Sequence, residues 1–253
     1  MSTNPHGALT GKAALITGAA RRVGATIARK LHAAGANIVL HYRSSAEAAQ
    51  ALAGELNEIR PNSVVLAEAD LLDLSQLQML PAIAASNFGT LDILVNNAST
   101  FYPTPVGDIT EIDWNDLIGT NLRAPLFLSQ AASAALRISN GLIVNIADIH
   151  GTRPLSRHPV YSIAKAGVIM LTQSLARELG PSVRVNAVAP GPVMWPEDGM
   201  DKELQGRIVD RTALKRPGSP DDVARAVLFF ATEAPYITGQ ILAVDGGRSV
   251  GGL

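Results

Sequence analysis

The chain has 253 residues, of which 47% are hydrophobic and 17% charged, and it contains no cysteine. A chain of this length and composition can bury one large core, and the absence of cysteine excludes disulfides, zinc-thiolate sites and a thiol nucleophile. The formal net charge is -1 and the charged residues are scattered, so neither a nucleic acid nor an anionic membrane is indicated as a partner, and we expect a small-molecule ligand.

The start of the chain, MSTNPHGALTGK, is too polar for a secretory signal, and no apolar run approaches the roughly 18 residues that would span a bilayer. We therefore expect a soluble, cytoplasmic protein. Residues 1–9 contain Asn, Pro and Gly without periodicity and are predicted to form a flexible tail, which leaves residues 10–253 as a single domain. The five histidines have no metal-ligand spacing, so no metal site is expected.

Short apolar runs alternate along the chain with longer segments of helical spacing. The predicted strands are residues 13–17, 37–41, 63–68, 91–95, 141–146, 183–189 and 240–244, and the predicted helices are residues 24–34, 44–60, 75–87, 112–136, 162–179 and 221–231. Strands that are apolar on both faces are typical of buried parallel sheets. The pattern predicts an α/β fold: a Rossmann-type, doubly wound, seven-stranded parallel sheet with helices on both faces.

The first predicted strand runs directly into a loop, Thr17-Gly18-Ala19-Ala20-Arg21-Arg22-Val23-Gly24, and then a helix. At such a junction, backbone N–H groups can face the pyrophosphate of a dinucleotide. The loop residues expected to bind it are Gly18, Arg21, Arg22 and Val23. The alternative is that Gly18 serves only a tight turn and Gly24 only helix packing.

The second strand ends without the carboxylate that would bind the ribose 2′-hydroxyl of NAD. Arg43 instead has a fork of N–H donors that fits the oxygens of a 2′-phosphate, and Ser44 can add a hydroxyl donor or cap the next helix. This predicts NADPH/NADP+ as the cofactor; the alternative is that Arg43 is an ordinary exposed residue. The residues expected at this end of the cofactor are His41, Tyr42, Arg43 and Ser44.

Other strand ends complete the expected cofactor site, because ligands bind at the carboxyl ends of parallel strands. Asp70 follows the third strand and can accept a hydrogen bond from adenine, although it can equally be a turn or cap residue. The remaining contacts are expected from Leu71 beside it, from Asn97, Ala98 and Ser99 after the fourth strand, and from Pro190 and Gly191 after the sixth.

Tyr161 and Lys165 are four residues apart at the start of a predicted helix, so their side chains emerge on the same face. Free tyrosine has a pKa of about 10, and we expect the nearby ammonium group to lower the pKa of Tyr161. The pair predicts acid–base chemistry, and Lys165 is also expected to bind the ribose hydroxyls. The alternative is a surface tyrosine beside a lysine that extends to solvent.

Residues 192–216 interrupt the alternation of strands and helices with Trp195, Pro196 and many charges. Because they follow the carboxyl end of a strand, we predict a helical flap over a substrate pocket, with Met194 and Trp195 lining the pocket. The alternative is a solvated surface excursion.

Several motifs together resemble the short-chain dehydrogenase/reductase family. They are Thr17-Gly18, Asn96-Asn97-Ala98, Asn121, Tyr161-x-x-x-Lys165, Pro190-Gly191 and Asp245-Gly246-Gly247, and they cover nearly the whole chain in the family's order. The resemblance implies that Tyr161, Lys165 and Asn121 are catalytic, and that Asn121 holds a water connecting Lys165 to solvent. It also implies a homotetramer paired through the apolar helix 162–179 and its neighbour; burial within a monomer is the alternative.

Two departures from the family pattern resemble the pteridine reductases. Arg22 stands where the phosphate loop usually has its middle glycine, and Asp148, thirteen residues before Tyr161, stands where the family has its catalytic serine. The stretches 41–44 and 96–105 also resemble that subfamily. This resemblance implies that Phe101 stacks on a pterin against the nicotinamide, and that Ser99 and Arg22 lie near the pterin and the cofactor phosphates.

The carboxylate at position 148 bears on which kind of double bond the protein is expected to reduce. An ionised Asp148 only accepts hydrogen bonds and would repel a developing alkoxide, which disfavours ketone reduction. We hypothesise that NADPH gives hydride to a C=N bond of a pterin, dihydropterin or dihydrofolate while Tyr161, coupled to Asp148 and Lys165, supplies the proton. The expected substrate contacts are Arg22, Ser99, Phe101, Asp148, Tyr161, Met194 and Trp195.

Two other functions stay open. One is an NADPH-dependent carbonyl reductase, such as a 3-oxoacyl-(acyl-carrier-protein) reductase, which would need a hydrogen-bond donor where Asp148 stands. The other is a non-catalytic NADPH-binding sensor, which would not need Tyr161, Lys165 and Asn121 together. Among pteridine reductases, the sequence does not decide between dihydropteridines, dihydrofolate, dihydromonapterin and oxidised biopterin.

Overall fold

The middle layer of the protein is a parallel sheet of seven strands in the order β3-β2-β1-β4-β5-β6-β7. The computed structural model describes residues 7–195 and 199–250. The strands are β1 (Ala13–Ile16), β2 (Asn37–Tyr42), β3 (Val64–Glu68), β4 (Ile93–Asn96), β5 (Leu142–Ile146), β6 (Arg184–Pro190) and β7 (Ile241–Val244). The predicted fold class is confirmed, with a strand at each of the seven predicted places.

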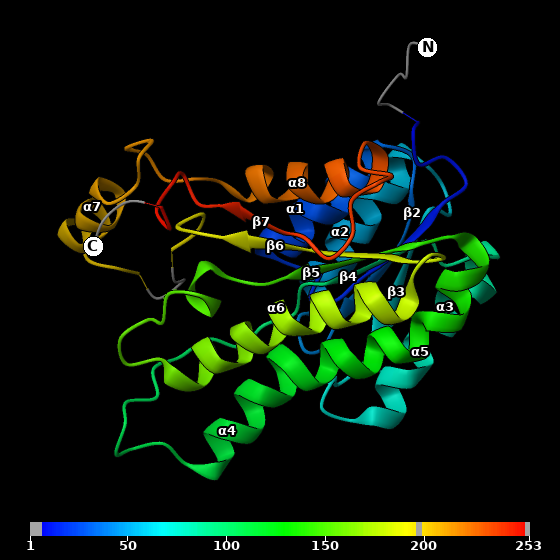
Figure 1. Cartoon of the computed structure of the whole chain (residues 1–253). Coiled ribbons are helices and arrows are strands. Elements are labelled where there is room, and N and C mark those ends of the chain that lie inside the picture. The colour runs from blue at the N-terminus through cyan, green and yellow to red at the C-terminus, as the bar shows by residue number, and fades with distance from the viewer. Residues whose placement is uncertain (1–6, 196–198, 251–253) are drawn as a thin grey trace.

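Helices cover both faces of the sheet (Figure 1). On one face lie α1 (Arg22–Ala33), α2 (Ala46–Ile59) and α8 (Pro220–Thr232), and on the other lie α3 (Leu74–Phe88), α4 (Glu111–Ile118), α5 (Ala124–Ser139) and α6 (Pro159–Leu179). The apolar residues of strand β1 pack on both faces of the sheet: Ala14 and Ile16 lie in the core on the α1 side, and Leu15 lies in the core on the α3 side. Successive side chains of a strand point to opposite faces, so an apolar strand holds both layers.

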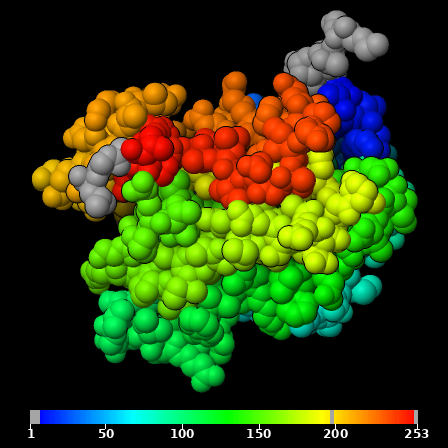
Figure 2. Space-filling view, in the orientation of Figure 1, coloured from blue at the N-terminus to red at the C-terminus, as the bar shows by residue number. Residues whose placement is uncertain are grey.

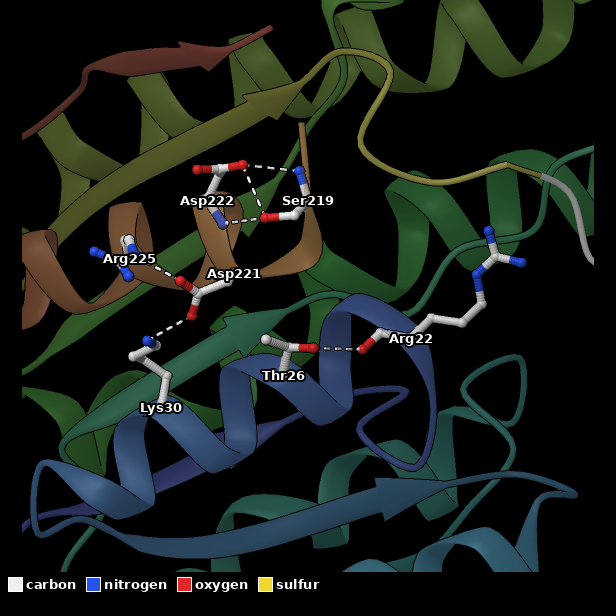
Figure 3. Close-up of polar contacts among 7 residues, drawn as sticks. All are labelled: Arg22, Thr26, Lys30, Ser219, Asp221, Asp222 and Arg225. Carbon is white, nitrogen blue, oxygen red and sulfur yellow. Dashed lines mark hydrogen bonds and ion pairs between the residues drawn. The ribbon is translucent and has the colours of Figure 1, made fainter. Parts of the chain in front are cut away.

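Helices α1 and α8 lie side by side on their face of the sheet (Figure 3). The carboxylate of Asp221 pairs with Lys30 of α1 and with Arg225 of its own helix. Helix α8 begins with a capping box in which the Ser219 hydroxyl accepts from the Asp222 N–H and the Asp222 carboxylate accepts from Ser219. These contacts position α8, whose buried residues pack in the core on the α1 side of the sheet.

The predicted helix 112–136 is wrong as a single α-helix. The structure divides it into α4, a π-helical turn at Gly119–Arg123, and α5. A π turn widens the helix locally and is common at functional sites. Asn121 lies in this turn, so its side chain is aimed by a break in the helix that apolar periodicity does not reveal.

The prediction of a flexible tail through residue 9 does not hold at Leu9, which is buried in the main core. Its N–H donates to the carbonyl oxygen of Ala34, just after α1, at 2.9 Å. Residues 1–6 of the predicted tail lie outside the described residues. The predicted flap does contain a helix, α7 (Lys202–Asp210), which projects beyond the end of the sheet (Figure 1).

No helix within residues 7–195 and 199–250 is both long and apolar enough to cross a membrane. The same residues contain no cluster of His, Asp or Glu side chains placed to hold a metal ion.

Candidate active site

The loop between β1 and α1 has the backbone of a phosphate site. Gly18 has a φ of +60°, and a Cβ on Gly24 would collide with the carbonyl oxygen of Gly18 and lie 2.6 Å from Asn97 Nδ2. Helix α1 has no side-chain cap and no acidic residue in its first turn. Its first N–H groups and positive dipole end are thus suited to an anion, which fits the pyrophosphate of a dinucleotide.

Hydrogen bonds join this loop to the end of β4. The Thr17 hydroxyl oxygen accepts from the N–H groups of Asn97 (2.9 Å) and Ala98 (3.0 Å), and the Asn97 side chain donates to Thr17 O (2.8 Å) and Gly18 O (3.1 Å). The order of the sheet reverses between β1 and β4, and the crevice at such a reversal is where open α/β sheets bind ligands. The side chain of Asn97 therefore holds the loops of this crevice together.

The His41 side chain supports the phosphate loop through a hydrogen bond to its backbone. Its Nδ1 accepts from the Gly18 N–H at 3.1 Å, so its Nε2 carries the proton and donates to Ala69 O, also at 3.1 Å. Burial lowers the pKa of His41 to about 4, so the ring is neutral. We expected His41 to contact the cofactor. Its side chain points inward from the end of β2 and positions the loop, and contact of the residue with a cofactor stays a prediction.

The end of β2 exposes two residues expected at the 2′-phosphate, Arg43 and Ser44. Tyr42 is buried, and its hydroxyl donates to Glu68 at 3.2 Å, which ties β2 to β3. Asp70 forms a turn, with its carboxylate accepting from the Leu72 N–H at 2.9 Å. The turn alternative for Asp70 is therefore observed, while contacts of Asp70 and the buried Leu71 with adenine stay predictions.

Pro190 and Gly191 leave the end of β6 beside the C-terminal segment. The Gly191 N–H donates to Val244 O at 3.0 Å, and a Cβ on Gly191 would lie 2.6 Å from the Cβ of Asp245. Glycine is needed here because the segments that hold Gly191 and Asp245 approach each other so closely. Contacts of this pair with a cofactor stay a prediction.

Tyr161, Asp148 and Lys165 form the chemical centre. The Tyr161 hydroxyl donates to Asp148 Oδ2 at 2.8 Å, and the other carboxylate oxygen accepts from the His150 N–H at 2.8 Å. Lys165 Nζ donates to Ile146 O at 2.9 Å and lies 5.6 Å from the centre of the Tyr161 ring. Both Tyr161 and Lys165 are buried. The structure brings together three predicted residues, one from the loop after β5 and two from α6.

The electrostatics of Tyr161 differ from the expectation. Burial raises the pKa of Tyr161 well above its usual value, and the negative charge and hydrogen bond of Asp148 raise it further. Burial lowers the pKa of Lys165 to about 8, against an opposing effect of Asp148. The expected lowering of the Tyr161 pKa was wrong, because the hydroxyl is buried and contacts the carboxylate, while the ammonium points to Ile146 O. In this state Tyr161 keeps its proton and is an acid rather than a phenolate.

Asn121 anchors the loop that follows β4. Its Nδ2 donates to Thr100 O (3.0 Å) and Leu117 O (2.9 Å), and its Oδ1 accepts from the Ser99 hydroxyl at 2.5 Å. Its side chain therefore positions the loop that carries Ser99 and Phe101. The water connecting it to Lys165 stays a prediction.

Phe101 lies at the opening of this centre and is 50% exposed. Its ring stands edge-on to Tyr161, with ring centres 4.9 Å apart and planes at 81°, and stacks on His158, with centres 4.7 Å apart and planes at 10°. His158 was not among the predicted site residues. It is the N-cap residue of α6, and its position three residues before Tyr161 was the available signal.

Arg22 connects the phosphate loop to the predicted flap. Its φ is +54°, a left-handed conformation that costs a non-glycine residue about 1–2 kcal/mol, and its Nη2 donates to Trp195 O at 3.0 Å. Figure 3 shows the side chain extending from the start of α1 toward the segment that holds Trp195. Met194 and Trp195 are half-buried at this point, and Pro196 lies outside the described residues.

A loop-helix anion site at the reversal of a parallel sheet, beside a buried tyrosine–lysine pair, defines an oxidoreductase that uses a nicotinamide dinucleotide. The chain belongs to the short-chain dehydrogenase/reductase family. Residues 18–249 match the family model described as "Enoyl-(Acyl carrier protein) reductase".

Curated relatives of two kinds match most of the chain. Pteridine reductase 1 of Leishmania tarentolae is 36% identical, with 99% of each chain covered. The 3-oxoacyl-(acyl-carrier-protein) reductase FabG of Staphylococcus aureus is also 36% identical, covering 93% of this chain and 97% of the relative. The enzyme of that name from Staphylococcus epidermidis is 34% identical, covering 93% and 98%. Sequence identity therefore shows the family but does not distinguish between the substrates of these two kinds of enzyme.

Proposed function

We propose that this protein is an NADPH-dependent pteridine reductase that reduces a pterin, a dihydropterin or dihydrofolate. The observation that carries the proposal is the hydrogen bond of 2.8 Å from the Tyr161 hydroxyl to the Asp148 carboxylate. A ketone substrate develops negative charge on oxygen and needs donors around it, whereas a carboxylate is an acceptor and repels that charge. A pterin offers ring N–H and amino donors, which a carboxylate can bind.

The same bond suggests how the proton is delivered. When a pterin donates its N–H groups to Asp148, the Tyr161 hydroxyl loses its acceptor and turns toward the ring nitrogen that needs a proton. The raised pKa of Tyr161 keeps that proton in place until substrate arrives. The positive charge of Lys165 beside the ring stabilises the phenolate that remains. Bound NADPH would supply the hydride.

The proposed cofactor is NADPH because β2 ends with Arg43 exposed and no carboxylate in the following turn. Replacing Arg43 with Asp is expected to raise the KM for NADPH about 10–100-fold, the range for losing a hydrogen-bonded charge pair, and to lower the KM for NADH. Steady-state rates with each nucleotide measure this, with an unchanged melting temperature as the control. An unaltered NADPH KM would show that Arg43 does not bind the 2′-phosphate.

We also propose self-association into a homotetramer. Helix α6 lies along one face of the molecule (Figure 2), and its Ile163 and Met170 side chains are 50% and 61% exposed. Leu126 on α5, a helix that contacts α6, is also exposed. Large apolar side chains in such number on neighbouring helices are typical of a surface that is covered in an assembly.

A carbonyl reductase is the second candidate function, because the Staphylococcus aureus ketoacyl reductase is as similar in sequence as the pteridine reductase. The two candidates differ in what they require at position 148. A carbonyl reductase needs a donor there, and Asp148→Ser would supply one.

Steady-state NADPH oxidation with dihydrobiopterin, dihydrofolate and an acetoacetyl thioester separates these functions. We expect the wild-type protein to reduce a pterin and not the thioester, and Asp148→Ser to lose at least about 10²-fold of kcat/KM with the pterin. Turnover of the thioester alone would overturn the proposal. So would an Asp148→Ser protein with full pterin activity.

A further inference from the structure

We propose that His158 is a positioning residue for the substrate: its imidazole covers one face of Phe101 and holds that ring edge-on to Tyr161, so that the other face receives a planar substrate. This inference rests on the proposed function for the identity of that planar substrate. It assigns a role to a residue outside the motifs of the fold.

The first step is the geometry of the three rings. The His158 and Phe101 rings are nearly parallel, with planes at 10° and centres 4.7 Å apart, which is an aromatic stack. Phe101 meets Tyr161 at 81° with centres 4.9 Å apart, an edge-to-face contact. One residue therefore fixes the plane of Phe101 while Phe101 contacts the proton donor directly.

The second step is that His158 is itself held rigidly. It is the N-cap residue of α6, its carbonyl oxygen accepts from the Ser162 N–H at 3.0 Å, and its Nδ1 donates to Ser156 O at 2.8 Å. Tyr161 and Lys165 lie four positions apart in α6, which begins one residue after His158. The ring that supports Phe101 therefore belongs to the cap of the helix that carries the two groups that handle the proton.

The third step is that Phe101 needs such support. The backbone beside it is fixed, because Thr100 O accepts from Asn121 at 3.0 Å and the Thr104 N–H donates to Arg157 O at 2.7 Å. The residue is nevertheless 50% exposed even with His158 against it. Ordering a side chain on binding costs conformational entropy, so a ring already held in place binds a planar ligand more tightly.

The kinetic test compares the wild type with His158→Ala and His158→Phe. We expect His158→Ala to raise the KM for dihydrobiopterin about three- to tenfold, the range of one aromatic pair, with kcat and the KM for NADPH little changed. His158→Phe keeps a flat ring and should restore the wild-type KM. A wild-type KM in His158→Ala, or failure of His158→Phe to restore it, would overturn the proposal.

A spectroscopic test needs no substrate and so separates this inference from the proposed function. The five phenylalanines can be isotope-labelled, and the Phe101 ring signals assigned by their loss in Phe101→Leu. Both His158 and Tyr161 contribute ring-current shifts to Phe101, and we expect the His158 contribution to be lost in His158→Ala and kept in His158→Phe. Unchanged Phe101 shifts in His158→Ala would refute the stack, whereas absent pterin turnover with the expected shifts would refute only the pteridine assignment.

Discussion

Replacing Tyr161 with phenylalanine is expected to lower kcat by roughly 10²–10⁴-fold, the usual contribution of a general acid. The variant keeps the ring that meets Phe101 and removes only the hydroxyl that donates to Asp148. The raised pKa keeps this hydroxyl protonated, so the variant removes the proton that the wild-type site holds for the reaction. Single-turnover NADPH oxidation with a saturating pterin measures the chemical step directly.

Tyr236→Phe is the matched control for that experiment. Tyr236 is fully exposed on the surface, so losing its hydroxyl should leave kcat unchanged. The KM for NADPH in Tyr161→Phe should stay close to the wild-type value, which separates loss of the acid from loss of the cofactor. A Tyr161→Phe protein with more than a tenth of the wild-type kcat would refute the role of Tyr161 as the acid.

Acidification from pH 6.5 to 4 is expected to destabilise the fold by up to about 3 kcal/mol for each of two buried histidines. Burial lowers the pKa values of His32 and His41 to about 4, so both are neutral in the folded protein. In the unfolded chain they take up protons below about pH 6.5. Their stabilising effect is complete above that pH and is lost as the pH falls toward 4.

Urea unfolding across this pH range measures the effect, and a double variant isolates it. His32 Nε2 contacts the Ser63 hydroxyl at 2.7 Å, and that hydroxyl donates to Arg60 O, so the histidine is the donor. Glutamine at 32 can donate in the same way, and asparagine at 41 can accept from the Gly18 N–H. His32→Gln with His41→Asn should flatten the pH dependence between 6.5 and 4; an unchanged slope would assign it to other groups.

Contacts formed across the chain explain where the structure differs from the expectations. Gly18 and Ala69 turn the His41 ring inward, so that the ring supports the phosphate loop, and contact of this residue with a cofactor stays a prediction. The pKa of Tyr161 was expected to fall because Lys165 is near in sequence. Asp148, from another element, contacts the hydroxyl and contributes to the opposite shift.

The sequence by itself determined the alternation of strands and helices, the loop that suits a phosphate, and the Tyr161–Lys165 pair. These features depend on local physics: apolar periodicity, the freedom of glycine at Gly18, and the spacing of residues on one helix. Only the tertiary structure decided the π turn that aims Asn121 and the stack of His158 on Phe101. The stack requires two segments that are distant in sequence to meet at the end of the sheet, and no local pattern encodes which side chains will meet there.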